Sequence, residues 1–159
     1  MYAEMTSHKD ERIAHLVRLL ERQFRRNLQA KLKQHDVMFG HWEFLRILWD
    51  EEGLSQKELA DRAGLTGPTA HTALSKMEVK GLIEKEVPKG GQSRPVINLS
   101  PLGRSLRLKL EPLAIETNNT ASQGLAADEI SHFRRLLIKM TQNLDEDSEV
   151  QRARDVQES

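Results

Sequence analysis

Cysteine is absent from this sequence of 159 residues, which excludes disulfides, thiolate metal ligands and a thiol-based redox switch. The sequence also lacks any apolar run that approaches the roughly 20 residues needed to cross a bilayer. Residues 1–12 are too polar to form the apolar core of a signal peptide. We therefore expect a cytoplasmic protein with no membrane partner.

Catalytic motifs are equally scarce. The sequence has no nucleophile elbow, no phosphate-binding loop and no clustered acid–base pair, so we expect neither an enzyme nor a cofactor. Among its scattered histidines, His8 and His15 lie seven residues apart, which places them on one face of a helix. A third ligand from elsewhere would complete a metal site there. Metal sensing is therefore an alternative, although our prediction is that no metal is bound.

The charges of the chain sum to zero but are unevenly distributed. Residues 53–110 contain ten Lys or Arg and five Asp or Glu, whereas residues 111–159 contain five and ten respectively. Residues 1–52 contain nine of each kind. A basic middle segment is what a phosphate-binding surface requires. Because chance clustering of solvated charges is the alternative, the charge pattern needs support from other features.

Long amphipathic helices are predicted at both ends of the chain. In residues 9–33 apolar side chains recur every three or four residues, at Ile13, Leu16, Val17, Leu20, Phe24, Leu28 and Leu32. A similar stripe predicts a helix over residues 127–144, with Ile130, Phe133, Leu137, Met140 and Leu144 on one side. The residues that follow are mostly charged, so we expect 146–159 to be a frayed tail.

Shorter helices are predicted in the middle of the chain. Residues 40–50 form an apolar-rich helix, which we expect Gly53 to close because glycine adopts a left-handed cap cheaply. Ser55 and Glu58 have the spacing of a capping box, in which each residue accepts a hydrogen bond from the other's backbone amide. This box predicts that a helix begins at residue 56.

That helix is short, because Gly64 ends it after residue 63. Thr66 then caps a further helix, which has Pro68 in its first turn, where a missing amide costs nothing. The second helix runs to Lys80, and its predicted inward stripe is Ala70, Ala73, Leu74 and Met77.

A β-hairpin is predicted after these helices. Residues 82–87 and 96–99 are short β-branched runs that flank a loop rich in glycine and proline. Lys89 and Arg94 give this loop a positive charge. Ser100 then caps a further helix, with proline at its first position.

Two helices joined by a tight glycine turn and followed by a basic hairpin form a winged helix-turn-helix. We therefore predict a mainly α fold with a small β-hairpin wing and long terminal dimerisation helices. One helix enters the major groove of DNA, and its N-terminal side chains reach the base edges. The candidate DNA-binding residues are small, polar or basic: Ser55, Gln56, Thr66, Gly67, Pro68, Thr69, His71, Thr72, Ser75, Lys76, Lys89 and Arg94. The alternatives are that the winged helix binds protein rather than DNA, that Thr66 serves only as a helix cap, and that His71 is only a solvated surface residue.

The order of these motifs resembles the MarR family of bacterial regulators. The resemblance covers about residues 10–145 and is carried by residues 40–45, 55–60, 65–69, 76–83 and 98–103. The wing departs from the family, which usually has Asp-x-Arg or Asp-Arg-Arg where this chain has Gly91-Gln92-Ser93-Arg94. Arg94 either enters the minor groove, which is the interpretation we favour, or neutralises a phosphate.

The resemblance implies a homodimeric repressor that binds double-stranded DNA at a near-palindromic operator. It implies a single domain over residues 1–159, with dimerisation helices at 9–35 and 101–145 and a DNA-binding lobe at 40–100. A small organic anion, such as an aromatic acid, is expected to release the DNA from a site between these parts. Anion recognition needs Arg or His beside apolar walls, and the candidates are His15, Arg18, Arg22, His41 and Trp42. For each of them an ordinary surface or core role is the alternative.

Overall fold

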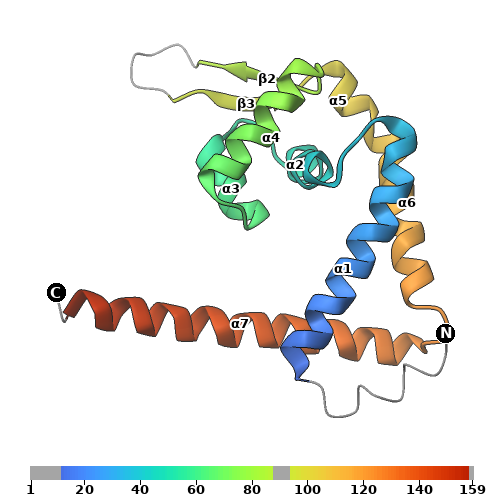
Figure 1. Cartoon of the computed structure of the whole chain (residues 1–159), viewed down its shortest axis with the longest axis vertical. Helices are drawn as coiled ribbons and strands as arrows, with labels where there is room; N and C mark the ends of the chain where they lie inside the picture. The colour runs from blue at the N-terminus through green and yellow to red at the C-terminus, as the bar shows by residue number, and fades with distance from the viewer. Residues whose placement is uncertain (1–11, 88–93, 158–159) are drawn as a thin grey trace. The chain divides into compact units, whose positions relative to one another are not determined.

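The structure is a computed structural model that describes residues 12–87 and 94–157 (Figure 1). Residues 1–118 and 119–159 form two compact units, and each is described by itself. The elements are α1 (Ile13–Leu32), the 3-10 helix η2 (Lys33–His35), α2 (Phe39–Asp50), β1 (Leu54–Ser55), α3 (Gln56–Ala63), α4 (Gly67–Val79), β2 (Ile83–Glu86), β3 (Val96–Leu99), α5 (Pro101–Ser105), α6 (Arg107–Ala121) and α7 (Ala127–Gln157). The mainly helical winged fold predicted from the sequence is confirmed.

The wing belongs to a three-stranded antiparallel sheet with the strand order β1-β3-β2. Strands β2 and β3 pair from Ile83 opposite Leu99 to Glu86 opposite Val96. Strand β1 was not predicted, because two residues are too few to show an alternating pattern.

The end of α2 differs from the prediction. The helix is capped by Glu51 in an extended conformation, and Gly53 lies beyond the cap. Gly53 has a φ of 75° and donates its N–H to Ile97 O at 3.1 Å. Its conformational freedom therefore serves the turn into β1 rather than the helix end.

The helix-turn-helix itself begins and ends where its caps predict. Ser55 and Glu58 form the complete capping box, with Glu58 N donating to Ser55 Oγ at 3.3 Å and Ser55 N to Glu58 Oε2 at 2.8 Å. Gly64 adopts the left-handed conformation that ends α3, with a φ of 63°. Thr66 caps α4 through the amide of Thr69. Local capping chemistry thus fixes the length of both helices.

The core of the first unit lies between α2, α3, α4 and the sheet. The predicted stripe of α4 faces it, with Ala70, Leu74 and Met77 buried and Ala73 half-buried. The other fully buried large side chains include Phe44, Leu45, Leu48, Leu59, Ile83 and Ile97. Burying each such side chain contributes roughly 1.5–3 kcal/mol to folding, so this core holds the helix-turn-helix and the wing together.

Helix α5 is joined tightly to the turn that follows α4. Ser100 Oγ donates to Gly81 O at 2.6 Å and accepts from Gly103 N at 3.0 Å. Trp49 Nε1, from α2, donates to Gly103 O at 2.9 Å. A Cβ atom on Gly103 would lie 2.1 Å from Leu82 O, so only glycine permits this approach. The start of α5 therefore fixes the end of α4.

The helix predicted to begin at residue 101 is divided at Leu106 into α5 and α6. Helices α1 and α6 lie side by side in Figure 1. Lys31 Nζ lies 3.0 Å from Glu116 Oε1, and Thr117 Oγ1 donates to Asn27 Oδ1 at 3.1 Å. These polar contacts fix how α6 packs along the second half of α1.

The second unit consists mainly of α7, which begins where Ala126 N donates to Glu129 Oε2 at 2.8 Å. The helix continues to Gln157, beyond residue 146, where the frayed tail was expected to begin. Residues 145–157 contain neither glycine nor proline, and straight-chain charged residues support a helix without an apolar stripe. Within the described part of the chain, neither α7 nor any other helix has the length and apolarity that crossing a membrane requires.

We expect Gly103→Ala to lower the free energy of unfolding by about 2–3 kcal/mol, because the added methyl group forces α5 away from Leu82 O. Urea unfolding at fixed protein concentration measures the loss. Gly40→Ala is the matched control, since a Cβ atom on Gly40 meets nothing within 4 Å, and it should leave stability unchanged or raise it by up to about 1 kcal/mol. Equal urea midpoints for the two variants would contradict the tight junction.

Candidate nucleic-acid interface

Helix α4 exposes one face along its whole length. Because its other face carries the buried stripe, the side chains that point outward are those predicted to meet DNA. Thr66, Gly67, Pro68, Thr69, His71, Thr72 and Lys76 are exposed, and Ser75 is half-buried. The structure thus brings these eight candidates together at the cap and on the exposed surface of a single helix.

Several of the hydroxyl groups already have local partners. Thr66 Oγ1 accepts from Thr69 N at 3.4 Å and lies 2.9 Å from Thr69 Oγ1. Thr72 Oγ1 donates to Pro68 O at 3.0 Å, which leaves its oxygen able to accept a further hydrogen bond. Thr66 therefore caps α4, which was the alternative to a DNA contact for this residue. Thr72 Oγ1 can still accept a hydrogen bond from the solvent side.

Helix α3 is tied to this surface through one side-chain contact. His71 Nδ1 lies 3.2 Å from Gln56 Oε1, so the start of α3 and the second turn of α4 present their polar groups together. Ser55 differs, because its hydroxyl donates to Glu58 Oε2 at 2.6 Å and accepts from Glu58 N. The hydrogen bonds from Ser55 lower the pKa of the Glu58 carboxyl. Ser55 is thus committed to the capping box, and Gln56 is the better placed of the two candidates.

A hollow of about 390 Å³ lies between the base of the wing and the start of α3. It is lined by Ser55, Gln56, Lys57, Lys85, Arg94, Pro95 and Ile97. Arg94 is exposed and lies two residues before the start of β3. Lys89, the other predicted wing residue, lies outside the described residues. Lys57 and Lys85 were missed by the sequence analysis. The capping box could have indicated Lys57, because it fixes that residue on the exposed first turn of α3.

The described cations of residues 40–107 fall into a paired and an unpaired group. Arg62 pairs with Glu51 at 2.6 Å, Arg104 with Glu52 at 2.7 Å and Arg107 with Asp50 at 3.4 Å. The hydrogen bond that Arg62 donates to Glu51 raises the pKa of Arg62, and the bond that Arg104 donates to Glu52 raises the pKa of Arg104. Around the end of α2, therefore, positive charge is neutralised.

The second group remains uncompensated. Lys57, Lys76 and Arg94 form no ion pair with any residue that the structure describes. These three side chains belong to α3, α4 and the base of the wing, which are the elements that carry the DNA-binding candidates. The positive charge left free in this part of the lobe is therefore where a phosphate backbone would need it.

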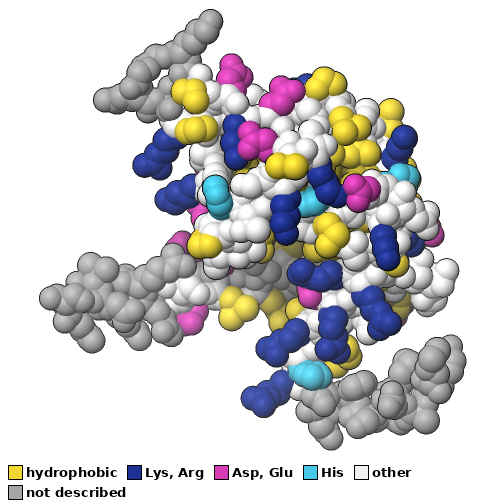
Figure 2. Space-filling view, turned by 45° about the horizontal axis from the view of Figure 1, so that its top comes forward, with side chains coloured by type: hydrophobic (Ala, Val, Ile, Leu, Met, Phe, Trp, Pro, Cys, Tyr) yellow, Lys and Arg dark blue, Asp and Glu magenta, His cyan; other side chains and the backbone are white. Residues whose placement is uncertain are grey.

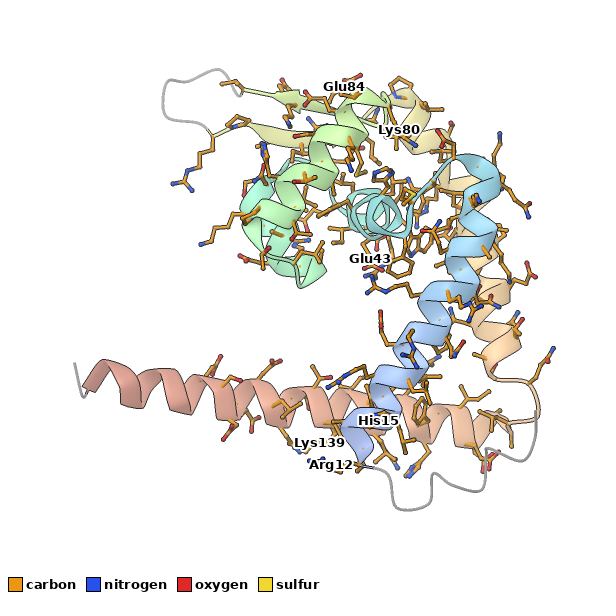
Figure 3. All side chains as sticks on the ribbon, viewed as in Figure 1. Arg12, His15, Glu43, Lys80, Glu84 and Lys139 are labelled. Carbon is orange, nitrogen blue, oxygen red and sulfur yellow. The ribbon has the colours of Figure 1, made fainter. Side chains whose placement is uncertain are left out.

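The five effector candidates are not brought together. His15, Arg18 and Arg22 are exposed on α1, and Figure 3 labels His15 near the start of that helix. His41 and Trp42 are buried in α2, and the Trp42 ring packs edge-on against Trp49 with centroids 5.6 Å apart. Trp42 therefore packs in the core, which was the alternative to effector binding for this residue.

A groove of about 280 Å³ lies instead between α1, α2 and the end of α3. Its lining combines charged, aromatic and small or aliphatic residues: Glu21, Phe24, Arg25, Phe39, Gly40, Glu43, Ala63 and Leu65. Arg25 lies 4.6 Å from the centroid of the Phe39 ring and 2.6 Å from Glu21. Glu43 is labelled on α2 in Figure 3. Sequence analysis missed Arg25, although it continues the three- and four-residue spacing of Arg18 and Arg22 along α1.

His41 has a different character from a surface cation. It is 4% exposed, and its Nδ1 atom is buried without a hydrogen-bond partner within the part of the chain that the structure describes. Burial lowers the pKa of His41 below its ordinary value of 6.5; Lys80 and then Lys76 add to this effect, and Asp36 opposes it. His41 is therefore a neutral core histidine at physiological pH.

Comparison with known proteins supports the same interpretation. A sequence model of the MarR family matches residues 35–93, which span the helix-turn-helix and the first part of the wing. The transcriptional regulator MgrA of Staphylococcus aureus is 28% identical over 130 residues, covering 81% of this chain and 87% of MgrA. The complex of S. aureus MepR with DNA superposes with a TM-score of 0.75 at 25% identity, covering 86% of this chain and 99% of MepR.

The chain resembles MarR-family regulators in both sequence and fold. A further relative, the regulator TtmR of Methylorubrum extorquens, is 30% identical over 90 residues, although the match covers only 57% of this chain and 46% of TtmR. These matches bear out the resemblance seen in the sequence, and both MgrA and TtmR are transcriptional regulators. The alternative of metal sensing stays untested, because His8 lies outside the described residues; among those described, no three potential ligands cluster.

The contacts within this chain explain two of the motifs that carry the resemblance. Gly81 and Leu82, at the end of α4, supply the carbonyl groups that Ser100 Oγ and Ser100 N bind. Gly103 allows α5 to reach that turn. The segments 80–83 and 98–103 therefore have their characteristic residues because they meet each other in the folded lobe.

The low pKa of His41 predicts a pH-dependent stability. Above pH 6.5 the histidine is neutral in both states, and as the pH falls below 6.5 the unfolded chain takes up a proton before the folded chain does. The free energy of unfolding should therefore decrease between pH 6.5 and the lower pKa of the folded state. Comparing urea unfolding of the parent and of His41→Leu at pH 8 and pH 5 isolates this effect. If the free energy of unfolding decreases equally in both proteins between pH 8 and pH 5, His41 is not a source of the pH dependence.

Proposed function

We propose that this chain is a homodimeric repressor of the MarR type that inserts α4, as its recognition helix, into the major groove of a near-palindromic operator. The observation that carries the proposal is the exposed face of α4, whose polar side chains adjoin the unpaired cations Lys57, Lys76 and Arg94. Small residues at the start of α4, including Gly67 and Pro68, permit close approach of its backbone to the base pairs. The complex of the related MepR with DNA supports this arrangement.

The dimer is supported by apolar side chains that a single chain leaves exposed. On α1 these are Ile13, Leu16, Val17 and Leu20, and on α7 they include Phe133, Leu136, Ile138 and Leu144. Apolar side chains stand among the charged ones at the surface of the single chain (Figure 2). An exposed helical stripe of this size on each unit favours burial against a second copy. A two-fold dimer presents two α4 helices, and the operator must then share their symmetry.

Release by an organic anion is the second part of the proposal. Arg25 and the rings of Phe24 and Phe39 provide a cation beside aromatic walls in the groove between α1 and α2. Glu21 already pairs with Arg25, so an anion must displace that carboxylate to bind. Binding would be linked to the position of the DNA-binding lobe, because the groove joins α1 to α2 and to the end of α3. DNA must then weaken anion binding by the factor by which the anion weakens DNA binding.

Light scattering should give a mass twice the 18.2 kDa of one chain at micromolar concentration. Val17→Glu places a charge in the apolar stripe of α1 and should shift the mass toward that of a monomer, with loss of operator binding. Arg26→Glu is the matched control, because Arg26 is exposed on the same helix and lies about two and a half turns from Val17, on the side opposite the stripe. A monomeric parent protein, or a dimer that tolerates Val17→Glu, would refute assembly through α1.

Salicylate serves as a probe of the proposed groove in titration calorimetry. Glu21→Gln should tighten its binding about five- to tenfold by freeing Arg25, and Arg25→Gln should weaken it by a similar factor, given the strength of charge-assisted hydrogen bonds. Arg26→Gln removes the neighbouring charge, which does not line the groove, and should have little effect. If all three variants bind salicylate as the parent does, the groove is not the anion site.

A further inference from the structure

The hollow at the base of the wing differs in charge from the other two hollows described here. Its lining contains Lys57, Lys85 and Arg94 and no Asp or Glu. The groove beside α1 contains Glu21 and Glu43, and the hollow at the end of α2 contains three carboxylates beside its two arginines. Of the three, only the hollow at the wing base presents a purely cationic lining, which suits an anion.

The three cations of this hollow are not equivalent. Lys57 and Arg94 lack a carboxylate partner among the described residues, whereas Lys85 pairs with Glu78 of α4 at 2.7 Å. The nearest carboxylate on α3 is that of Glu58, which accepts hydrogen bonds from Ser55 N and Ser55 Oγ. Two uncompensated charges therefore face the hollow, and Lys85 is positioned beside them by its contact with the recognition helix.

The rest of the lining suits a sugar-phosphate chain. Pro95 and Ile97 form an apolar wall next to the cations, and a nucleic-acid backbone alternates charged phosphates with less polar sugars. Gln56 belongs to the hollow and lies 3.2 Å from His71 on α4. A duplex that contacts the exposed face of α4 would therefore continue directly over Gln56 into the hollow.

The register of the hairpin places Arg94 at the base of the wing. The last pair of the ladder is Glu86 opposite Val96, so Arg94 lies only two residues beyond it. From this position Arg94 shares a hollow with Lys57 of α3. A side chain that probes the minor groove would instead be expected to project from the far end of the loop.

We propose that Lys57, Lys85 and Arg94 form a single clamp for DNA-backbone phosphates at the base of the wing. Arg94 then acts as a phosphate ligand rather than as the minor-groove probe favoured from the sequence, and Lys57 is its principal partner. The clamp positions the recognition helix on the duplex and reads no bases. This inference rests on the proposed DNA-binding function.

The test is the salt dependence of binding by the full-length protein, measured by fluorescence anisotropy. The probes are a duplex selected from a random library for tight binding and a scrambled duplex of the same length. Each phosphate contact contributes about 0.9 to the slope of log K against log salt. Lys57→Ala and Arg94→Ala should each reduce the slope by about one per protomer, and Arg94→Lys should restore most of it.

The two duplexes distinguish the alternatives. A phosphate clamp predicts that Lys57→Ala and Arg94→Ala weaken both duplexes by the same factor, so that the ratio of their affinities is unchanged. Lys109→Ala is the matched control, because it removes an exposed lysine of α6 that has no ion pair among the described residues. Its slope of log K against log salt should equal that of the parent protein. Circular dichroism melting confirms that the variants fold.

Three results would overturn the clamp. If Arg94→Ala loses affinity for the selected duplex alone, Arg94 probes a groove rather than binding phosphate. If the variants keep the salt slope of the parent protein, these side chains make no phosphate contacts. Saturable calorimetric binding of inorganic phosphate that Lys57→Ala abolishes would mean a free-anion site instead. A parent protein that binds no duplex would refute the proposed regulator itself, which is a separate outcome.

Discussion

The approach of α5 to the turn after α4 is the constraint on which the DNA-binding lobe depends. Gly103 has no side chain, so Leu82 O can occupy the position where a Cβ atom would otherwise lie. Ser100 Oγ then bridges Gly81 O and Gly103 N, and the indole of Trp49 binds Gly103 O. The recognition helix, the wing and the helices that follow are therefore joined at one point, through backbone groups that cannot rearrange independently.

This junction also determines how a distant change can reach the DNA. Helix α6 follows α5 after a single residue, and Arg107 at its start donates to Trp49 O at 2.9 Å. Along α6, Glu116 and Thr117 contact α1. A displacement of α1 against α2 therefore acts on the lobe through packed helices and direct hydrogen bonds. Such contacts can carry the coupling that an effector in the groove requires.

Features set by local chemistry could be predicted from the sequence. The capping box at Ser55, the left-handed Gly64 and the cap at Thr66 each depend on residues only a few positions apart, and all three were found. Features that depend on tertiary neighbours could not. Arg25 gains its groove only when α2 packs beside it, and Trp42 is buried in the core in edge-on contact with Trp49. The helical tail was missed because low apolarity was equated with disorder, although the segment lacks residues that break helices.

The neutrality of the chain shows why net charge is a poor guide to nucleic-acid binding. Its positive and negative side chains are equal in number, but they are not paired uniformly. Around the end of α2 each of Arg62, Arg104 and Arg107 is held by a carboxylate. Lys57 and Arg94 have no such partner among the described residues. Because exposed charges interact only over about 8 Å in physiological salt, an approaching phosphate responds to these nearby unpaired cations and not to the balance of the whole protein. Within residues 40–107, the pairing of charges, rather than their count, therefore leaves the free cations on α3, α4 and the base of the wing.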